Sequence, residues 1–315
     1  MLDSLIQQLL EGDRRAVARI ISLIENDEVP KSKLMSKIYP HTGKAYILGI
    51  TGAPGAGKST LTNRIVAEIR RNGLTVAVIA VDPTSPFTGG AILGDRIRMQ
   101  SHTLDPEVFI RSMGTRGSLG GLSRHTNETV KVMDAFKKDV IIIETVGVGQ
   151  SEFDIMYIAD TTVVVLNPGA GDAIQSIKAG IMEIADVFIV NKADMDGADR
   201  VKAETEAMLE MRKSGNWRPP VVLTAAVNGT GIEQAWEKIL EHRKYLETTG
   251  QLEKIRKVKI GEELKEILGQ EIKENLWTVL EHSGEVKMLL TKLINREIDP
   301  YSVAEQIIKT HIRII

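Results

Sequence analysis

Short apolar runs alternate with amphipathic stretches through the middle of the chain. The runs are rich in β-branched residues and read YILGIT, TVAVIAVD, VFIRSM, DVIIIETVG, TTVVVLNP, DVFIVNKAD and PPVVLTAA. Continuous apolar strands separated by helices are typical of a parallel sheet that is buried on both faces. After the first run, Leu61, Ile65 and Ile69 form one apolar stripe, and Gly73 follows as a helix stop signal. We therefore predict an α/β fold in which helices flank a mostly parallel central sheet.

The N-terminal part of the chain follows a helical pattern instead. Apolar residues recur near helical spacing within residues 3–26, with a break at Gly12-Asp13; they are Leu5, Leu9, Val17, Ile20, Ile21 and Ile24. We therefore predict three regions, which are a helical N-terminal extension at 1–44, a domain containing the sheet at 45–248 and a C-terminal helical region at 249–315.

The C-terminal region is charged and favours helices. Leu264, Ile267, Leu268 and Ile272 recur at intervals of three and four in a segment that we predict to form a pair of helices. The final stretch YSVAEQIIKTHIRII predicts one more helix in the tail at 284–315. The pattern leaves two arrangements open, because these helices could pack back on the sheet or form an arm that joins two copies of the chain.

Composition narrows the classes of partner. Forty basic residues stand against 42 acidic ones, and no block of like charge marks a tail for nucleic acid or membrane. The chain has no cysteine, which excludes disulfides, zinc knuckles and thiol chemistry and fits a cytoplasmic protein. The N-terminus lacks the apolar core of a signal peptide, and no run reaches the roughly twenty apolar residues of a membrane span. We therefore expect a soluble, cytoplasmic protein with no nucleic-acid or membrane partner.

The stretch GAPGAGKST follows the first predicted strand and opens the first predicted helix. It fits the phosphate-loop pattern of Gly, four residues and Gly-Lys-Ser, in the strand and helix context that the pattern requires. Its glycines let backbone N–H groups turn toward phosphates, Lys58 reaches the outer phosphates, and the Ser59 hydroxyl binds magnesium. Residues 45–248 are therefore predicted to be a P-loop nucleotide-binding domain. The expected nucleotide contacts are Gly52, Ala53, Pro54, Gly55, Ala56, Gly57, Lys58, Ser59 and Thr60.

A second motif indicates which base is bound. Asn191-Lys192-Ala193-Asp194 ends a predicted strand, where a loop at the carboxyl edge of a parallel sheet faces the ligand crevice. Asp194 can accept two hydrogen bonds from guanine N1 and N2, which adenine cannot offer, and the Lys192 stem can cover the ring. Thr224-Ala225-Ala226 follows the strand VVL and could offer backbone N–H groups to the guanine oxygen. The two motifs together predict a GTP site.

Acidic residues at two further strand ends are candidates for the magnesium ion. Asp82 closes TVAVIAVD and Glu144 closes DVIIIE, so either carboxylate could bind the ion directly or through water. Asp82 could instead be a turn residue before Pro83. In ETVGVGQ, Gly147 stands where its N–H would sense the γ-phosphate.

Two glycine-bearing stretches have the composition of nucleotide switches. One, at 88–99, contains Asp95 and Arg98, and the other, at 114–123, contains Arg116. Both could equally be solvated connections. Val148 follows Gly147, where Ras-like enzymes have the glutamine that orients the attacking water. We therefore expect slow intrinsic hydrolysis, for which Gln150 is a doubtful substitute.

The series GAPGAGKST, VDPTSP, GDRIRM, GSLGGLS, ETVGVGQSE, PGAGD and NKAD resembles the MeaB/ArgK-type GTPases. The resemblance covers most of the chain. It implies a GTPase chaperone that gates cofactor loading and protects an adenosylcobalamin-dependent mutase such as methylmalonyl-CoA mutase, which accelerates GTP hydrolysis in return. It also implies a homodimer formed through C-terminal helices, and it adds a cobalamin adenosyltransferase as a further candidate partner.

The resemblance also implies roles for individual residues. GTP or GDP and magnesium are the implied cofactors, with Asn191 and Asp194 on guanine. The implied ion ligands are Ser59, Asp82, Asp95 and Glu144, and the implied catalytic residues are Lys58, Asp95, Glu144 and Lys178. A third switch after VVVLNPGAGD would contain Asp172, Gln175 and Lys178. Without the family, GDAIQSIKAGIMEIA is simply a helix with Asp172 near its start.

Three other functions are weighed against the chaperone. A nickel-delivery GTPase would need a metal store, but the histidines are scattered: His41, His102, His125, His242, His282 and His311. A GTP-dependent scaffold without useful turnover stays open, because the group that activates hydrolysis could come from a partner. A kinase for basic amino-acid transport is not favoured, since no second substrate site or membrane segment is visible.

Overall fold

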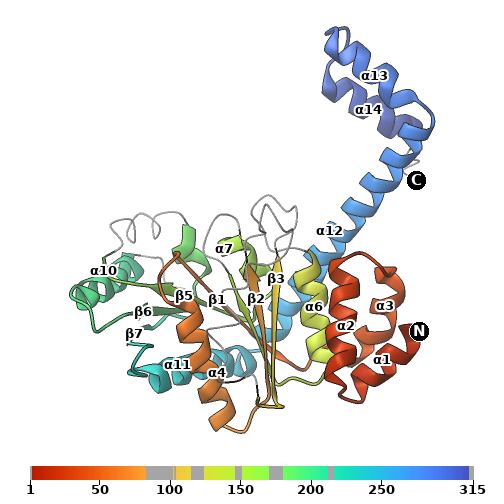
Figure 1. Ribbon diagram of the computed structural model, residues 1–315. Coiled ribbons are helices and arrows are strands. Elements are labelled where there is room, and N and C mark those ends of the chain that lie inside the picture. Colours follow the sequence, from red (N-terminus) through yellow and green to blue (C-terminus); the bar gives the residue numbers. More distant parts are fainter. Residues whose placement is uncertain are drawn as a thin grey trace. The chain divides into compact units, whose positions relative to one another are not determined.

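The computed structural model describes residues 2–82, 102, 104–114, 124–145, 151–169, 180–211 and 216–311 (Figure 1). The chain divides into two compact units, Met1–Glu253 and Lys254–Ile315. The first unit contains the sheet and the helices around it, and the second is helical.

The sheet of the first unit has the strand order β3-β2-β4-β1-β5-β6-β7. Every strand pair in the described part of the chain is parallel, which confirms the predicted sheet. The carboxyl ends of these strands therefore meet at one edge, where ligands bind in such sheets. The strands are β1 (Tyr46–Gly52), β2 (Val76–Asp82), β3 (Val108–Gly114), β4 (Val140–Glu144), β5 (Thr161–Leu166), β6 (Val187–Asn191) and β7 (Val221–Thr224).

Two hydrophobic clusters cover the two faces of the sheet. On one face, α4 (Lys58–Arg71) and α11 (Ile232–Thr248) pack on alternate residues of the strands, such as Leu48 and Ile50 of β1. The opposite face is covered by the N-terminal helices and by helices that connect the later strands along the chain. This arrangement explains the continuous apolar runs, because both sets of alternate side chains are buried. The other elements on the second face include α6 (Arg124–Ala135), α7 (Ser151–Asp154), η3 (Ile155–Tyr157), α9 (Met182–Ile184) and α10 (Ala198–Met211).

The N-terminal helices pack as part of the first unit, beside α6 (Figure 1). They are α1 (Leu2–Leu10), α2 (Arg14–Glu25), α3 (Lys31–Ile38) and the short η1 (Tyr39–His41). The predicted break at Gly12-Asp13 is present, and Asp13 accepts hydrogen bonds from the N–H groups of Arg15 at 2.6 Å and Ala16 at 3.1 Å. This side-chain cap satisfies donors that the first turn of α2 would otherwise leave unpaired.

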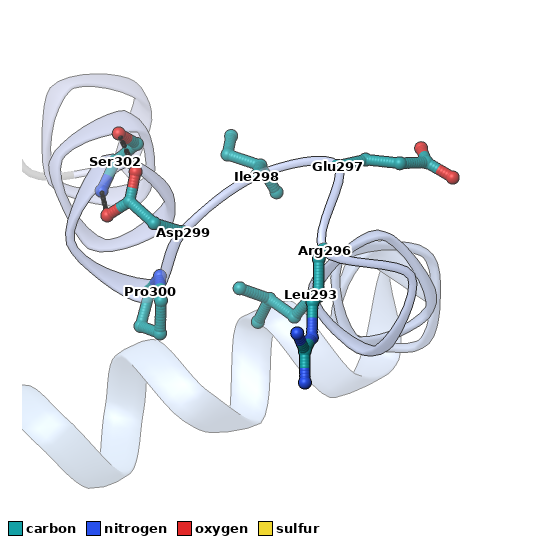
Figure 2. Close-up of a pocket in the computed structure, with 7 residues that line it drawn as sticks. All are labelled: Leu293, Arg296, Glu297, Ile298, Asp299, Pro300 and Ser302. Carbon is teal, nitrogen blue, oxygen red and sulfur yellow. Dashed lines mark hydrogen bonds between the residues drawn. The ribbon is translucent and has the colours of Figure 1, made fainter.

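The second unit consists of most of α12 (Gln251–His282) together with α13 (Glu285–Ile294) and α14 (Pro300–His311). The tail at 284–315 thus contains two helices, where the sequence pattern predicts one. Figure 2 shows the turn between them, which surrounds an open hollow of about 580 Å³. Asp299 begins α14 by accepting the N–H groups of Tyr301 at 2.9 Å and Ser302 at 3.0 Å. In the described ranges, no helix is both long and apolar enough to cross a membrane.

A buried polar network ties the amino-terminal edge of the sheet to α11. The Tyr46 hydroxyl donates to Thr161 Oγ1, which lies 2.7 Å from His242 Nδ1. His242 Nε2 lies 3.5 Å from Asp186 Oδ1, and the ring centroids of Trp217 and His242 are 4.8 Å apart, with the ring planes tilted by 50°. Only 3% of His242 is exposed, and this burial lowers its pKa to about 4. The imidazole is therefore neutral in the folded protein at pH values well above 4.

This network makes the stability of the protein sensitive to acid. Because the folded His242 resists protonation while an unfolded histidine takes a proton below about pH 6.5, the free energy of unfolding falls as the pH drops from 6.5 toward 4. Between pH 7.5 and 4.5 we expect His242 to account for a loss of about 2–3 kcal/mol in the free energy of unfolding. In urea unfolding, the free energy of unfolding of His242→Gln should fall less between pH 7.5 and 4.5, by that amount. The control His41→Gln, at an exposed residue, should match the wild type. Equal acid losses in both variants would contradict the prediction.

Candidate nucleotide site

The phosphate loop joins the end of β1 to the start of α4, as the sequence predicts. Gly57 has φ of 89°, and a Cβ there would lie 2.4 Å from Asn191 Nδ2. Gly52 has φ of 135°, and its Cβ would lie 2.2 Å from the Val165 carbonyl oxygen. Both positions exclude a side chain, since neither the left-handed backbone nor the neighbouring atoms leave room for one. The glycines therefore let the loop pack against β5 and against the loop that follows β6.

Lys58 lies across the inside of this loop. Its Nζ donates to the carbonyl oxygens of Gly52 at 2.7 Å and Ala53 at 3.0 Å, and only 7% of the residue is exposed. Two of the acceptors of this ammonium group are thus carbonyl oxygens, which carry only partial charge. A phosphate would offer this cation a full negative charge at the same place.

Ser59 and Glu144 meet beside the phosphate loop. Glu144 ends β4, opposite Ile50 of β1 and Ala80 of β2 in the sheet register, and is 4% exposed. The Ser59 hydroxyl donates to Glu144 Oε1 at 2.5 Å. A hydroxyl and a buried carboxylate supply the oxygen ligands that magnesium prefers, with the remaining positions left to phosphate and water. These two side chains therefore fit a magnesium ion at the carboxyl edge of the sheet.

Asp82 also ends a strand at this edge, since its backbone pairs with Gly114 of β3. Its side chain lies outside the described part of the structure, as do several other predicted site residues. The residues whose placement is not described are Asp95, Gly147, Asp172, Gln175 and Lys178, together with Arg98, Arg116, Val148 and Gln150. The roles assigned to all of these stay predictions.

Asn191 connects the phosphate loop to the loop after β7. Its Nδ2 donates to the carbonyl oxygen of Ala56 at 2.9 Å, and its Oδ1 accepts from Thr224 Oγ1 and from the Ala226 N–H, each at 3.1 Å. The residue is 2% exposed. One buried amide thus fixes the spacing between two loops that the sequence assigns to opposite ends of a nucleotide.

The Asn191 loop continues with Lys192 in a left-handed conformation, at φ of 60°. The Ala193 N–H then donates to the Thr224 carbonyl oxygen at 2.9 Å, and Asp194 is exposed. The hydrogen bond of Ala193 keeps the loops after β6 and β7 side by side. This arrangement leaves the Asp194 carboxylate available to a ligand at the edge that also holds the phosphate loop.

The loop after β7 differs from the prediction in one respect. From the sequence, Thr224, Ala225 and Ala226 could offer backbone N–H groups to the guanine oxygen. In the structure, the Ala225 N–H donates to the Thr230 carbonyl oxygen at 3.0 Å, and the Ala226 N–H donates to Asn191. Both donors already have protein acceptors, because the loop folds back on itself after Ala225.

Arg64 is a residue of this region that sequence reasoning missed. It projects from α4, and its guanidinium donates to the carbonyl oxygens of Ala226 at 2.9 Å and Val227 at 2.6 Å. No motif marks it, since its partners lie more than 160 positions further along the chain.

Known proteins resemble the whole chain. The family model of the methylmalonyl-CoA mutase-associated GTPase MeaB matches residues 17–281. A Pyrococcus abyssi protein named as a candidate GTPase is 53% identical over 98% of this chain and 96% of its own length. The GTPase ArgK of Escherichia coli is 34% identical over 96% of this chain and 94% of its own length.

A solved structure supports the same relationship at the level of the fold. The crystal structure of an LAO/AO transport system kinase superposes with a TM-score of 0.73 at 28% identity. The match covers 98% of this chain and 96% of that one. The similarity therefore extends over the N-terminal and C-terminal helices as well as the sheet.

The contact between Gly57 and Asn191 can be tested against a matched glycine. Gly55 also has a positive φ, of 75°, but a Cβ there would meet no atom within 4 Å. Gly55→Ala should lower the free energy of unfolding by about 1–2 kcal/mol through backbone strain alone. Gly57→Ala should lower it by about 1–3 kcal/mol more, because the new methyl displaces the Asn191 amide from its partners.

Urea unfolding of the two variants measures this difference. Equal destabilisation would show that the Asn191 amide does not depend on the space at Gly57.

Proposed function

This chain belongs to the MeaB family of methylmalonyl-CoA mutase-associated GTPases, and on that premise we propose that it times the delivery of a cofactor to a partner enzyme. The chain is a GTPase. The partner is an adenosylcobalamin-dependent mutase of the methylmalonyl-CoA mutase type, whose cofactor loading is gated and whose active form is protected by this protein. The family name supports the partner, and the connection made by Asn191 supports the nucleotide.

Two charged side chains at the carboxyl edge of the sheet, Lys58 and Asp194, would bind the two ends of GTP. Lys58 exchanges the carbonyl oxygens of Gly52 and Ala53 for the outer phosphates, which carry more negative charge. The exposed Asp194 accepts hydrogen bonds from guanine N1 and N2. Asn191 bonds to both the phosphate loop and the loop after β7, and so fixes the spacing between the two ends of the site.

Ser59 and Glu144 would hold magnesium, with Asp82 and Asp95 as further candidates. When bound, the ion neutralises charge that develops on the β- and γ-phosphates during hydrolysis. Before that, Glu144 keeps the Ser59 hydroxyl oriented at the mouth of the phosphate loop through the 2.5 Å hydrogen bond. The low exposure of both residues excludes water from this side of the phosphates, which strengthens each charge interaction.

The chain alone hydrolyses GTP slowly in this proposal, because its sequence lacks a glutamine directly after Gly147. A group supplied or ordered by the mutase would complete the site. Hydrolysis then reports that the partner is correctly engaged, and the bound nucleotide serves as a timer. A scaffold that binds GTP without this coupling would show no such dependence on the partner.

GTP turnover in the presence of a mutase tests this proposal. We expect methylmalonyl-CoA mutase from the same source to raise the rate about tenfold or more, as partners that complete a hydrolytic site do. Lys58→Ala should abolish both the basal and the stimulated rates, which shows that the turnover belongs to this site. Tight GTP binding without any stimulation would contradict the mutase partnership and favour a scaffold or another client.

We also infer that the protein acts as a homodimer through α12. Four apolar residues recur at every fourth position of this helix and are each at least half exposed: Ile260, Leu264, Leu268 and Ile272. Such spacing places them along one side of the helix. Leaving this row in water forgoes about 1.5 kcal/mol or more for each side chain that a partner could cover. A second copy of α12 offers a surface of the same chemistry, as an isologous dimer requires.

Sedimentation velocity tests the dimer. Wild-type protein should sediment as a dimer, and the double variant Leu264→Gln with Leu268→Gln should sediment as a monomer because the apolar row is interrupted. Glu266→Gln, on the same helix, is the control and should stay dimeric. A monomeric wild type at micromolar concentration would contradict the inference.

A further inference from the structure

The loop after β7 uses nearly all of its own backbone donors. The Ala225 N–H bonds to Thr230, the Ala226 N–H bonds to Asn191, and the Asn228 and Gly229 N–H groups both bond to the Ala225 carbonyl oxygen, at 3.1 and 2.9 Å. The Thr230 N–H donates to Asn228 Oδ1 at 3.0 Å. Among the described residues, the N–H groups of Val227 and Gly231 are the donors of this loop that have no acceptor, and of the two only Val227 lies next to a carbonyl that a side chain holds.

Arg64 determines which way that donor points. Its Nε and one terminal nitrogen hold the carbonyl oxygens of Ala226 and Val227, which are consecutive along the loop. None of the peptide bonds in the described ranges is cis. In a trans peptide unit, the carbonyl of one residue and the N–H of the next point in opposite directions. The Ala226 carbonyl bound to Arg64 therefore turns the Val227 N–H to the side of the loop away from α4.

The loop after β7 is also tied to the base-recognition segment. The Ala226 N–H and the Thr224 hydroxyl both bond to Asn191, three positions before Asp194. The Val227 side chain is 76% exposed, so its backbone lies at the open surface of the loop. A ligand between this loop and Asp194 would meet one oriented N–H that the protein does not use.

We propose that Arg64 is a positioning residue for guanine recognition, which presents the Val227 N–H to the O6 atom of the base. The inference rests on the proposed GTP site. Guanine carries an acceptor at O6, whereas adenine carries an amino donor at the same position. A single fixed N–H therefore favours guanine and leaves adenine with two opposed donors. This assignment replaces the Ala225 and Ala226 N–H groups, which are already bonded.

An arginine suits this role better than a lysine. Its planar guanidinium presents several N–H donors in a fixed fork, so it can hold two neighbouring carbonyls at once. A lysine carries one flexible ammonium and would not fix the same peptide orientation. Because Arg64 belongs to the helix that begins at Lys58, the fork also ties the base loop to the phosphate loop helix.

Binding measurements with two nucleotides test the proposal. The probes are GDP and 2-aminopurine riboside 5′-diphosphate, which keeps the 2-amino group but lacks O6 and carries no proton on N1. The change in preference between variants, and not the preference itself, therefore reports the O6 contact. Calorimetry on wild type, Arg64→Ala, Arg64→Lys and the control Arg71→Ala compares their preference for GDP. Arg71 is on the same helix and bonds to Glu68 instead of the loop.

In the wild type and in Arg71→Ala we expect a clear preference for GDP over the analogue. In Arg64→Ala the preference should fall by about fivefold or more, which corresponds to one hydrogen bond, while affinity for the analogue stays unchanged. Arg64→Lys should fall between the two. Two results would overturn the role of Arg64 if the Arg64→Ala protein keeps the wild-type melting temperature. One is an unchanged preference for GDP over the analogue, and the other is an equal loss of affinity for both nucleotides. Failure of the wild type to bind GDP would instead contradict the proposed function.

Discussion

The buried amide of Asn191 is the contact on which the rest of the site depends. It ends β6 and bonds at once to Ala56 in the phosphate loop and to Thr224 and Ala226 in the loop after β7. An amide suits this position because it offers a donor and an acceptor in one rigid plane. The parallel sheet brings the three loops to one edge, and the amide then fixes their spacing to within a hydrogen bond. Gly57 is glycine because Asn191 occupies the space of its side chain.

Charge at the phosphate end is arranged before any ligand arrives. Lys58 donates hydrogen bonds to two carbonyl oxygens, and the Ser59 hydroxyl donates to the buried Glu144 carboxylate at the end of β4. Both interactions are weaker than those that a magnesium nucleotide would offer to the same atoms. In the proposed function, nucleotide binding is therefore an exchange of hydrogen-bond partners at Lys58 and Ser59, which limits the entropy cost of ordering the loop. At the amino-terminal edge of the sheet, the neutral, buried His242 affects the free energy of unfolding and lies away from the nucleotide site.

Local sequence signals predicted the fold well, because each apolar run buried on both faces stands out between helical stretches. The phosphate loop and Asn191-Lys192-Ala193-Asp194 were equally visible, since their chemistry depends on short spacing. The bonds that Arg64 makes to the loop after β7 were not visible, because partners far apart in the chain leave no local pattern. The bonded state of Ala225 and Ala226 depends on a turn that closes only in the folded loop. In the tail, α14 is the helix that the sequence pattern predicts, and α13, which begins after Gly284 at φ of 72°, is the one that it misses.

A crystal structure with magnesium and a non-hydrolysable GTP analogue would show directly whether the nucleotide binds at this edge of the sheet. We expect the analogue to span the edge, with its phosphates against Lys58 and Ser59 and its base against Asp194. Lys58 Nζ should then have left the carbonyl oxygens of Gly52 and Ala53. An analogue bound elsewhere, with Lys58 still on both carbonyls, would contradict the account.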